Sequence, residues 1–259
     1  MRFSVVIPVY NNKEWLPSCF DSILNQTFTD YEVIIVDDMS NDGNEEIIKE
    51  YIKKFKNRCK GVKFIRNKSK RLNGGTRNVG IVEAEGEYVF SIDCDDYLVD
   101  NNVLSDIDKK LNGEDVMFLG YKMLLADNST CKYIPDFKSI DEAIEGHLCS
   151  LWTRVVKTSL IKQVLYKEGT LFEDQAHHYR LMEKTKTISC LGRVTHIWNR
   201  KNQNQISKRD DYCWYRFNFC GEMYELIRTT KNDKRKEYYK GILKMFMNSC
   251  NEMVDSLWQ

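Results

Sequence analysis

The chain has 259 residues, and its 39 Lys and Arg nearly balance its 38 Asp and Glu, giving a formal net charge of +1. Hydrophobic residues make up 42% and aromatic residues 12%, which is enough apolar material for a buried core and excludes an intrinsically disordered chain. The balanced charge argues against a nucleic-acid binder, because such a domain usually carries a basic surplus. We expect one large domain, or a domain with an appendage.

The nine cysteines are scattered, odd in number and free of any CxxC pair, which disfavours a disulfide scaffold or a zinc ribbon. Free thiols in a reducing cytosol are the simpler expectation. The chain opens with a short apolar run that Pro8 interrupts, which predicts a strand and not a signal peptide. No stretch approaches the ~18 apolar residues that span a bilayer. We therefore expect a cytoplasmic protein that meets a membrane, if at all, from its surface.

In the first part of the chain, short β-branched runs alternate with amphipathic segments. Strands are expected at residues 3–7, 31–36, 62–65 and 88–92, and helices at 13–25, 45–55 and from 78 to 84. This alternation predicts an α/β fold with a mostly parallel central sheet that helices flank on both faces. In such sheets, ligands bind beyond the carboxyl ends of the strands.

From about residue 116 the alternation becomes irregular. We expect strands at 116–121, 123–126, 187–191 and 193–198, and helices at 140–145, 158–166 and from 172 to about 184. Beyond residue 210 the pattern is helical. The expected organisation is a catalytic domain over residues 1–208 and a helical C-terminal extension over 209–259.

Acidic residues follow the strand expected at 88–92. Asp93, Asp95 and Asp96 place three carboxylates within four residues, which repel one another unless a divalent cation or sugar hydroxyls compensate. Oxygen ligands favour Mg²⁺ or Mn²⁺ over zinc. The alternative is a solvated acidic turn in which Asp96 caps a helix. The loop after the first strand lacks GxGxxG, which argues against a dinucleotide site.

Seven segments resemble, in the right order, the motifs of family 2 glycosyltransferases, which are inverting enzymes with the GT-A fold. They are SVVIPVYN (4–11), VDDMSNDG (36–43), GTRNVG (75–80), SIDCDD (91–96), LWTRVV (151–156), FED (172–174) and the segment 198–207. Met39 stands where the family has Gly, Arg154 stands for Lys, and Asn199 and Gln205 depart from the pattern. The resemblance covers about residues 3–207.

The resemblance implies a role for each matching residue. Pro8 and Tyr10 would line the nucleotide pocket, and Asp38 would accept a hydrogen bond from a uracil-type base. Arg77 would lie near the nucleotide or its diphosphate. Asp93 would approach the ribose or the metal ion, while Asp95 and Asp96 would be ligands of the metal ion. Asp174 would be the general base that takes the proton of the acceptor hydroxyl.

Several of these residues have a plain structural alternative. Glu173 and Asp174 could simply complement a helix N-terminus, and His177 and His178 are better explained as packing or surface groups than as metal ligands. Three further pairs of alternatives stay open: His196 as a metal ligand or an ordinary strand histidine, Arg200 on phosphate or in a surface salt bridge, and Trp152 stacked on a sugar or buried in the core.

Two features outside the motifs concern partners. Residues 53–71 contain ten Lys or Arg and no acid, which suits either a solvated surface or anionic lipid headgroups. Apolar residues recur at helical spacing from 239 to 258. That helix is expected to pack on the catalytic domain, with a homodimer contact or membrane docking as alternatives.

The sequence therefore predicts a metal-dependent, inverting transferase that moves a sugar from a UDP-sugar to a glycan or lipid-linked acceptor in cell-surface polysaccharide synthesis. A catalytically inactive nucleotide- or glycan-binding module of the same fold is the alternative. A nucleotidyltransferase is disfavoured, because such enzymes usually have a Gly-rich loop after the first strand, where this chain has PVYNN.

Overall fold

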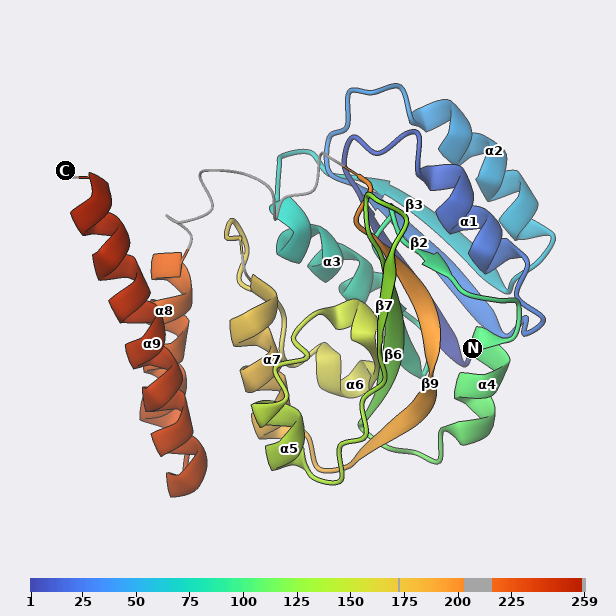
Figure 1. Cartoon of the computed structure of the whole chain (residues 1–259). Helices are drawn as coiled ribbons and strands as arrows, with labels where there is room; N and C mark the ends of the chain where they lie inside the picture. Colours follow the sequence, from blue (N-terminus) through green and yellow to red (C-terminus); the bar gives the residue numbers. More distant parts are fainter. Residues whose placement is uncertain (172, 203–215, 258–259) are drawn as a thin grey trace.

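A computed structural model of the chain describes residues 1–171, 173–202 and 216–257, with side chains described as far as residue 248. A single curled sheet of nine strands runs through the catalytic part, and helices cover both of its faces (Figure 1). Along the sheet the strands follow the order β3-β2-β1-β4-β8-β6-β9-β5, and β7 pairs with β6 outside this path. The predicted α/β class is confirmed.

The first four strands in this order form a parallel half-sheet. They are β1 (Phe3–Val9), β2 (Tyr31–Asp37), β3 (Gly61–Arg66) and β4 (Tyr88–Ser91). The connecting helices are α1 (Leu16–Leu24), α2 (Glu45–Lys56) and α3 (Leu72–Glu83). Because parallel strands point the same way, the loops after β1, β2 and β4 meet at one edge of the sheet.

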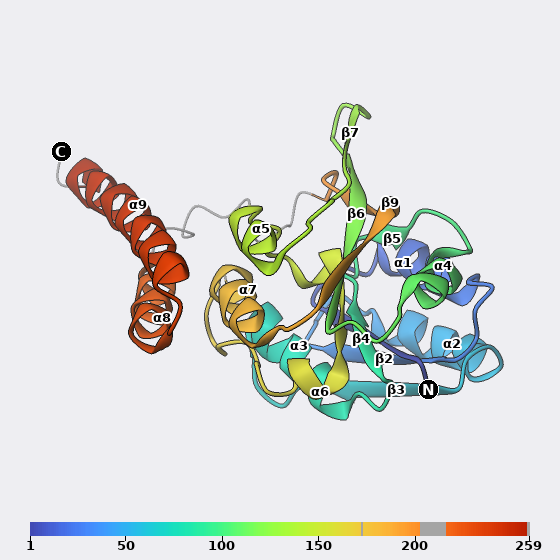
Figure 2. The ribbon, with the colours of Figure 1, turned by 90° about the horizontal axis from the view of Figure 1, so that it is seen from below.

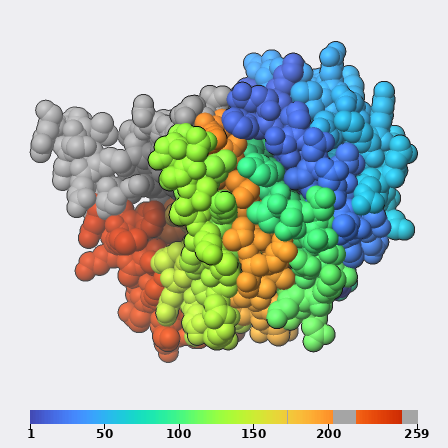
Figure 3. Space-filling view, turned by 45° about the vertical axis from the view of Figure 1, so that its right-hand side comes forward, coloured from blue at the N-terminus to red at the C-terminus, as the bar shows by residue number. Residues whose placement is uncertain are grey.

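Beyond β4 the sheet is mixed. β8 (Arg154–Lys157) runs antiparallel to both β4 and β6 (Val116–Leu124), and β9 (Ile188–Asn199) runs parallel to β6. The two-residue strand β5 (Tyr97–Leu98) pairs with β9, and β7 (Thr130–Tyr133) extends β6 into a hairpin. In Figure 3, orange β9 lies on the surface between the yellow-green segment that contains β7 and the green segment that contains α4 (Val103–Lys110).

Strand periodicity divides the core into two layers. In β1 and β2, the odd-numbered residues from Phe3 to Val9 and from Tyr31 to Ile35 pack with α1, α2 and α4, while Val6, Ile34 and Val36 face the opposite layer. The second layer contains α3, α5 (Ile140–Glu145), α6 (Thr158–Ile161) and α7 (Glu173–Lys184). This alternation is the reason why both faces of the sheet are covered.

The C-terminal helices α8 (Arg216–Thr229) and α9 (Asp233–Leu257) form a pair that lies beside α5 and α7, on the side of the molecule away from α1 and α2 (Figure 2). Phe219 and Met223 of α8, and Tyr239 and Ile242 of α9, are buried in the same core layer as Tyr179 of α7. In the described part of α9, these apolar side chains therefore pack against α8 and the catalytic part of the same chain.

Several predicted boundaries were wrong. The helix expected from residue 78 begins at Leu72, the helix expected to reach 166 ends at Ile161, and the strand expected at 123–126 is the end of β6. The two strands expected at 187–191 and 193–198 are one strand, because β9 continues through a bulge in which Gly192 adopts a φ of 81°. Such a left-handed φ suits glycine. Strands β5, β7 and β8 and helix α4 were not predicted.

The cysteines behave as expected in the part of the chain that the structure describes. Seven are free thiols, and Cys213 and Cys250 lie outside the described side chains. Among the described residues, no helix is long and apolar enough to cross a membrane.

Candidate active site

Hydrogen bonds join the loops at the carboxyl edge of the parallel half-sheet. The backbone N–H of Asn11, after β1, donates to Ser40 Oγ, after β2, at 3.0 Å. Asn12 Nδ2 donates to Cys94 Sγ, after β4, at 3.3 Å. Asn202, which follows β9, donates to Asn12 Oδ1 at 2.9 Å and to Asp95 Oδ2 at 2.8 Å. Residues from four separate segments are therefore held at one edge.

Asp38 is buried at the end of β2 and organises the chain between β3 and α3. Its Oδ1 accepts hydrogen bonds from Asn67 Nδ2 at 2.8 Å and from the backbone N–H of Arg71 at 2.9 Å. Its Oδ2 accepts one from the backbone N–H of Leu72 at 3.0 Å. Because each carboxylate oxygen has about two lone-pair sites, Oδ2 keeps one for a further donor.

The two residues expected to line a nucleotide pocket differ in exposure. Pro8 is buried within β1 opposite Val36, whereas Tyr10, just past the strand, is 39% exposed. The ammonium group of Lys70 lies over the Tyr10 ring, 2.9 Å from its centre. Met39 adopts a φ of 62° in the loop after β2. This left-handed conformation costs free energy for any residue with a side chain, because Cβ crowds the backbone. Glycine, which the family has at this position, avoids that cost.

The three aspartates after β4 are held differently. Asp96 is buried, and its Oδ1 accepts a hydrogen bond from the backbone N–H of Asn199 at 2.8 Å, while its Oδ2 has no partner within the described structure. Burial raises the pKa of Asp96 well above its usual value, and the charges of Asp95 and Asp93 add to this effect. Asp93 is partly exposed, with 27% of its side chain accessible.

Arg77 connects these acids to α7. Its guanidinium is buried and donates from one nitrogen to Asp93 Oδ1 at 2.5 Å and from another to Glu173 Oε1 at 3.1 Å. The helix comes close enough for this contact because residue 74 is glycine: a Cβ there would lie 2.6 Å from Cγ of Glu173. In this structure, then, Arg77 bridges two carboxylates.

Asp174 follows Glu173 in the first turn of α7 and is only partly buried. Its Oδ2 accepts a hydrogen bond from Ser150 Oγ at 3.3 Å. Burial raises the pKa of Asp174, an effect that the positive charge of Arg77 opposes. Burial also raises the pKa of Glu173, to about 7. Burial thus shifts the pKa of both adjacent carboxyl groups upward, the direction that is typical of general bases.

Arg154 holds the loop that carries Ser150. Its guanidinium is buried, forms no ion pair with any carboxylate among the described residues, and donates to the carbonyl oxygens of Leu148 and, at 3.4 Å, Ser150. It also lies 2.8 Å from His178 Nδ1, while His178 Nε2 lies 3.1 Å from the carbonyl of Ala143. Because an arginine only donates, the His178 proton must be on Nε2. His178 is thus a packing group, and so is His177, which stacks on Tyr166.

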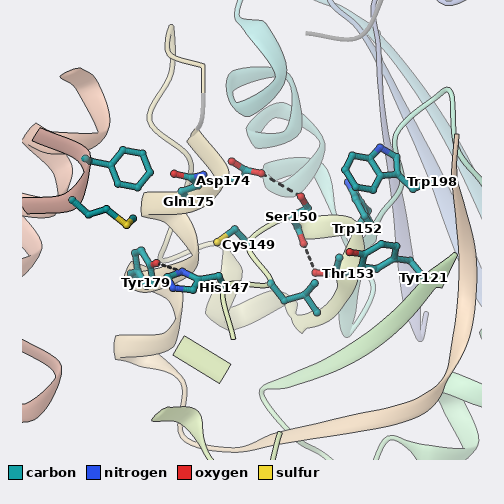
Figure 4. Close-up of a pocket in the computed structure, with 13 residues that line it drawn as sticks. Tyr121, His147, Cys149, Ser150, Trp152, Thr153, Asp174, Gln175, Tyr179 and Trp198 are labelled. Carbon is teal, nitrogen blue, oxygen red and sulfur yellow. Dashed lines mark hydrogen bonds between the residues drawn. The ribbon is translucent and has the colours of Figure 1, made fainter. Parts of the chain in front are cut away.

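A cavity of about 420 Å³ lies beside Asp174 (Figure 4). Its lining includes Tyr121, Trp152 and Trp198 on one side of Asp174, and His147 and Tyr179 on the other. The three aromatic rings contact one another, with centres 5.2 Å apart for Tyr121 and Trp152 and 5.4 Å apart for Trp152 and Trp198. Trp152 is nearly all buried, as its core alternative expected, and it also borders the cavity; its stacking on a sugar stays a prediction.

His196 and Arg200 lie near this aromatic cluster. The His196 ring is fully buried against Trp152, at 4.6 Å between ring centres, and burial lowers its pKa to about 3. Arg200 lies over the ring of Trp198 at 4.9 Å. Within the described residues, no group of three or more His, Cys, Asp or Glu side chains could together hold a metal ion. We therefore do not include His196 among the proposed metal ligands.

Sequence reasoning did not foresee the residues that support the site. Ser150, Asn12 and Asn202 carry no distinctive pattern, and each acts through a partner far away in the chain. The pairing of Arg77 with Glu173 spans 96 residues. The sequence did show the acidic pair at 173–174, but only Asp174 was predicted to act in catalysis, and the contact of Glu173 with Arg77 was not predicted.

The family model described as glycosyl transferase family 2 matches residues 4–121. The poly(ribitol-phosphate) beta-glucosyltransferase of Bacillus spizizenii is 42% identical to this chain over 100 residues, which are 38% of this chain and 15% of that protein. Glycosyltransferase GlyG of Streptococcus pneumoniae is 26% identical over 232 residues, covering 82% of this chain and 75% of GlyG.

Residues 4–121 of this chain are thus similar to glycosyl transferase family 2. The predicted resemblance is confirmed over this part, and the fold agrees with it: the crystal structure of S. aureus TarS 1-349 in complex with UDP-GlcNAc superimposes with a TM-score of 0.72. That match has 22% sequence identity and covers 96% of this chain and 72% of the TarS chain. Because this chain spans only 15% of the Bacillus relative, the activity of the whole protein is a matter for proposal.

Proposed function

We propose that this chain transfers a sugar from a UDP-sugar to a hydroxyl group of a glycan or lipid-linked acceptor in cell-surface polysaccharide synthesis, with inversion at the anomeric carbon. The observation that carries the proposal is the contact chain from Asp93 through Arg77 to Glu173 and its neighbour Asp174. It connects the edge where the fold binds nucleotides to a carboxylate beside a cavity. Relatives support the reaction class: TarS was crystallised with UDP-GlcNAc, and the Bacillus relative is a beta-glucosyltransferase.

On the donor side, the proposed roles follow from position. Tyr10 is exposed where a base could stack, and the remaining lone pair of Asp38 Oδ2 would accept the N–H of a uracil. Arg77 would hold Asp93 in place and add a positive charge near the diphosphate. Arg200 would contact phosphate from the end of β9.

A divalent cation fits the acids after β4. Mg²⁺ is usually held by one or two carboxylates together with substrate phosphates, so three protein ligands are not required. The unpartnered buried Oδ2 of Asp96 and the partly exposed Asp93 are the observations that favour such an ion, with Asp95 between them. One or two of Asp93, Asp95 and Asp96, together with the phosphates of the donor, would then hold Mg²⁺ or Mn²⁺, which would stabilise the charge that develops on the leaving diphosphate.

On the acceptor side, Asp174 would remove the proton of the attacking hydroxyl as the bond to the anomeric carbon forms. Burial raises its pKa, and so its affinity for a proton, above that of an ordinary aspartate, which suits a general base. Ser150 orients the carboxylate through its hydrogen bond to Oδ2. A single displacement of this kind inverts the anomeric centre and needs no second carboxylate as nucleophile, unlike a retaining glycosidase.

Calorimetric titration of UDP, GDP and their sugar conjugates, with and without Mn²⁺, tests the donor side. We expect UDP and a UDP-sugar to bind more tightly with the metal. Metal-independent binding would remove the proposed role of the acids, and no nucleotide binding at all would refute the function.

The variant Asp174→Asn tests the base. It should bind donor as the wild type does but transfer sugar about 10²–10⁴-fold more slowly, because a carboxamide cannot take the proton. Asp233→Asn is the matched control, since Asp233 is an exposed acid in the first turn of α9. Unchanged turnover in Asp174→Asn would remove Asp174 as the base, whereas a wild type without any turnover would favour the inactive binding module.

A further inference from the structure

The cavity beside Asp174 is separate from the proposed donor edge. The residues that line it come from β6, β9, α7, α9 and the chain from His147 to Thr153, and none from the loops after β1, β2 or β4. A molecule in this cavity can therefore contact Asp174 while a nucleotide occupies the carboxyl edge of the parallel half-sheet. At about 420 Å³ the space falls within the range of small-molecule sites in proteins.

The cavity has the mixed lining that a sugar requires. Tyr121 and Trp198 offer aromatic faces, against which the C–H groups of a sugar ring can pack. Polar groups border the cavity as well, including Ser150 and, on α7, Gln175. The side-chain oxygen of Gln175 is buried and has no partner within the described structure, so it is an acceptor that a hydroxyl could satisfy.

The far wall of the cavity is formed by the C-terminal helix. Met245 and Phe246 of α9 line it, and Met245 is 57% exposed, so this side chain is not committed to the core. Met247, two residues further along α9, is similarly exposed at 51% but does not border the cavity. The two methionines differ mainly in the direction in which the helix presents them.

A histidine fixes α9 against the catalytic helix. His147 Nδ1 lies 2.6 Å from the hydroxyl of Tyr179 on α7, and His147 Nε2 lies 2.8 Å from the hydroxyl of Tyr238 on α9. Burial lowers the pKa of His147, which favours the neutral ring. Since a neutral imidazole has one donor and one acceptor nitrogen, a single ring can satisfy both tyrosines at once. His147 itself has a φ of 50°, so the loop is held in a costly conformation to make this bridge.

We propose that α9 forms part of the acceptor site, in which Met245 and Phe246 select the acceptor sugar that packs against Trp198 and Tyr121, and His147 positions the helix. This inference rests on the proposed function and adds to it the far wall of the site and the residues that determine specificity.

The test compares Met245→Trp with Met247→Trp. The probes are methyl and octyl β-glycosides of glucose and N-acetylglucosamine, added to the full-length enzyme with a UDP-sugar while UDP release is followed. Met245→Trp should raise the KM for the best glycoside about tenfold or more, because it fills the cavity, with the affinity for UDP unchanged. Met247→Trp should match the wild type. Equal KM values in the two variants would overturn the proposal.

A second variant tests the bridge. Tyr238→Phe removes the hydroxyl that faces His147 and should raise both the acceptor KM and the rate of amide hydrogen exchange in α9. Tyr224→Phe, which changes an exposed tyrosine of α8, is the control. Exchange and KM equal to the wild type would overturn the role of His147.

The failure of the proposed function can be told apart from the failure of this inference. A wild type that releases no UDP with any donor or glycoside refutes the proposed function. Saturation-transfer NMR with the same glycosides then decides the inference: binding that Met245→Trp weakens supports it, and equal binding by both tryptophan variants overturns it.

Discussion

At the scale of single residues, the site depends on carboxylates whose neighbours differ. The carboxylate of Asp38 accepts hydrogen bonds from three donors of the chain. Asp96 is buried, and one of its oxygens has no partner within the described structure. Asp174 accepts a hydrogen bond from the hydroxyl of Ser150 beside a cavity. The residue type is the same, but the number of donors and the burial give each a different task. Sequence resemblance pointed to all three, because they lie in short contiguous motifs.

The pH dependence of transfer follows from the acid pair on α7. Because the pKa of Glu173 is raised to about 7 and that of Asp174 is also raised, the pair keeps a proton to a higher pH than ordinary carboxyl groups. The proposed base must be deprotonated, so kcat/KM should fall as the pH decreases through the range in which this pair takes up a proton. A profile of UDP release from pH 5 to 9 measures this, and a flat profile down to pH 5 would contradict it.

Ser150→Ala sharpens that test. The hydrogen bond from Ser150 lowers the pKa of Asp174, because it stabilises the charged carboxylate. Its removal should therefore move the acidic limb of the profile to higher pH. A limb that moves the other way, or not at all, would show that Asp174 does not control it.

At the scale of elements, the prediction succeeded where strands alternate with amphipathic helices and failed where strands depend on distant partners. The strands of the parallel half-sheet are seven, seven, six and four residues long, and their apolar runs were recognised. By contrast, β5 has two residues, too few to show a period, and β8 has four, as β4 does, but lies where the alternation is irregular. Their pairing depends on β9 and on β4 with β6, and local sequence does not encode such distant partners.

The contact between α3 and α7 makes a prediction about a glycine. Gly74→Ala should displace Glu173, break its ion pair with Arg77 and lower kcat about tenfold or more, since its Cβ would overlap the Glu173 side chain. Steady-state UDP release measures kcat, and the melting temperature reports stability.

Gly241→Ala in α9 is the control for that glycine. Its Cβ meets nothing within 4 Å, so the higher helix propensity of alanine should stabilise the fold by about 0.5–1 kcal/mol. A Gly74→Ala enzyme with normal kcat would show that the Arg77 bridge is dispensable.

At the scale of the whole molecule, the basic charge of the stretch 53–71 is partly neutralised within the chain. Four of its ten bases, Lys54, Lys63, Arg66 and Arg71, form ion pairs with acids of the same chain. Membrane association and a homodimer stay predictions.

Removal of α9 should destabilise the entire catalytic unit. A chain that ends at Asn232 loses the buried Tyr239 and Ile242, each worth about 1.5–3 kcal/mol of burial, and uncovers Tyr179. We expect the melting temperature to fall by roughly 10 °C. Met247→Ser, at an exposed position of the same helix, should leave it unchanged. An equally stable truncation would mean that α9 docks only loosely.

The strand order also dictates when the acidic motif can become ordered during synthesis. The four strands of the parallel half-sheet are complete once residue 91 has left the ribosome, so this half can pair early. Asp95 and Asp96, however, depend on Asn202 and Asn199, and β5 has β9 as its partner. A nascent chain must therefore emerge by roughly a further hundred residues before the acids proposed to hold the metal are fixed, a delay set by loop closure over that separation.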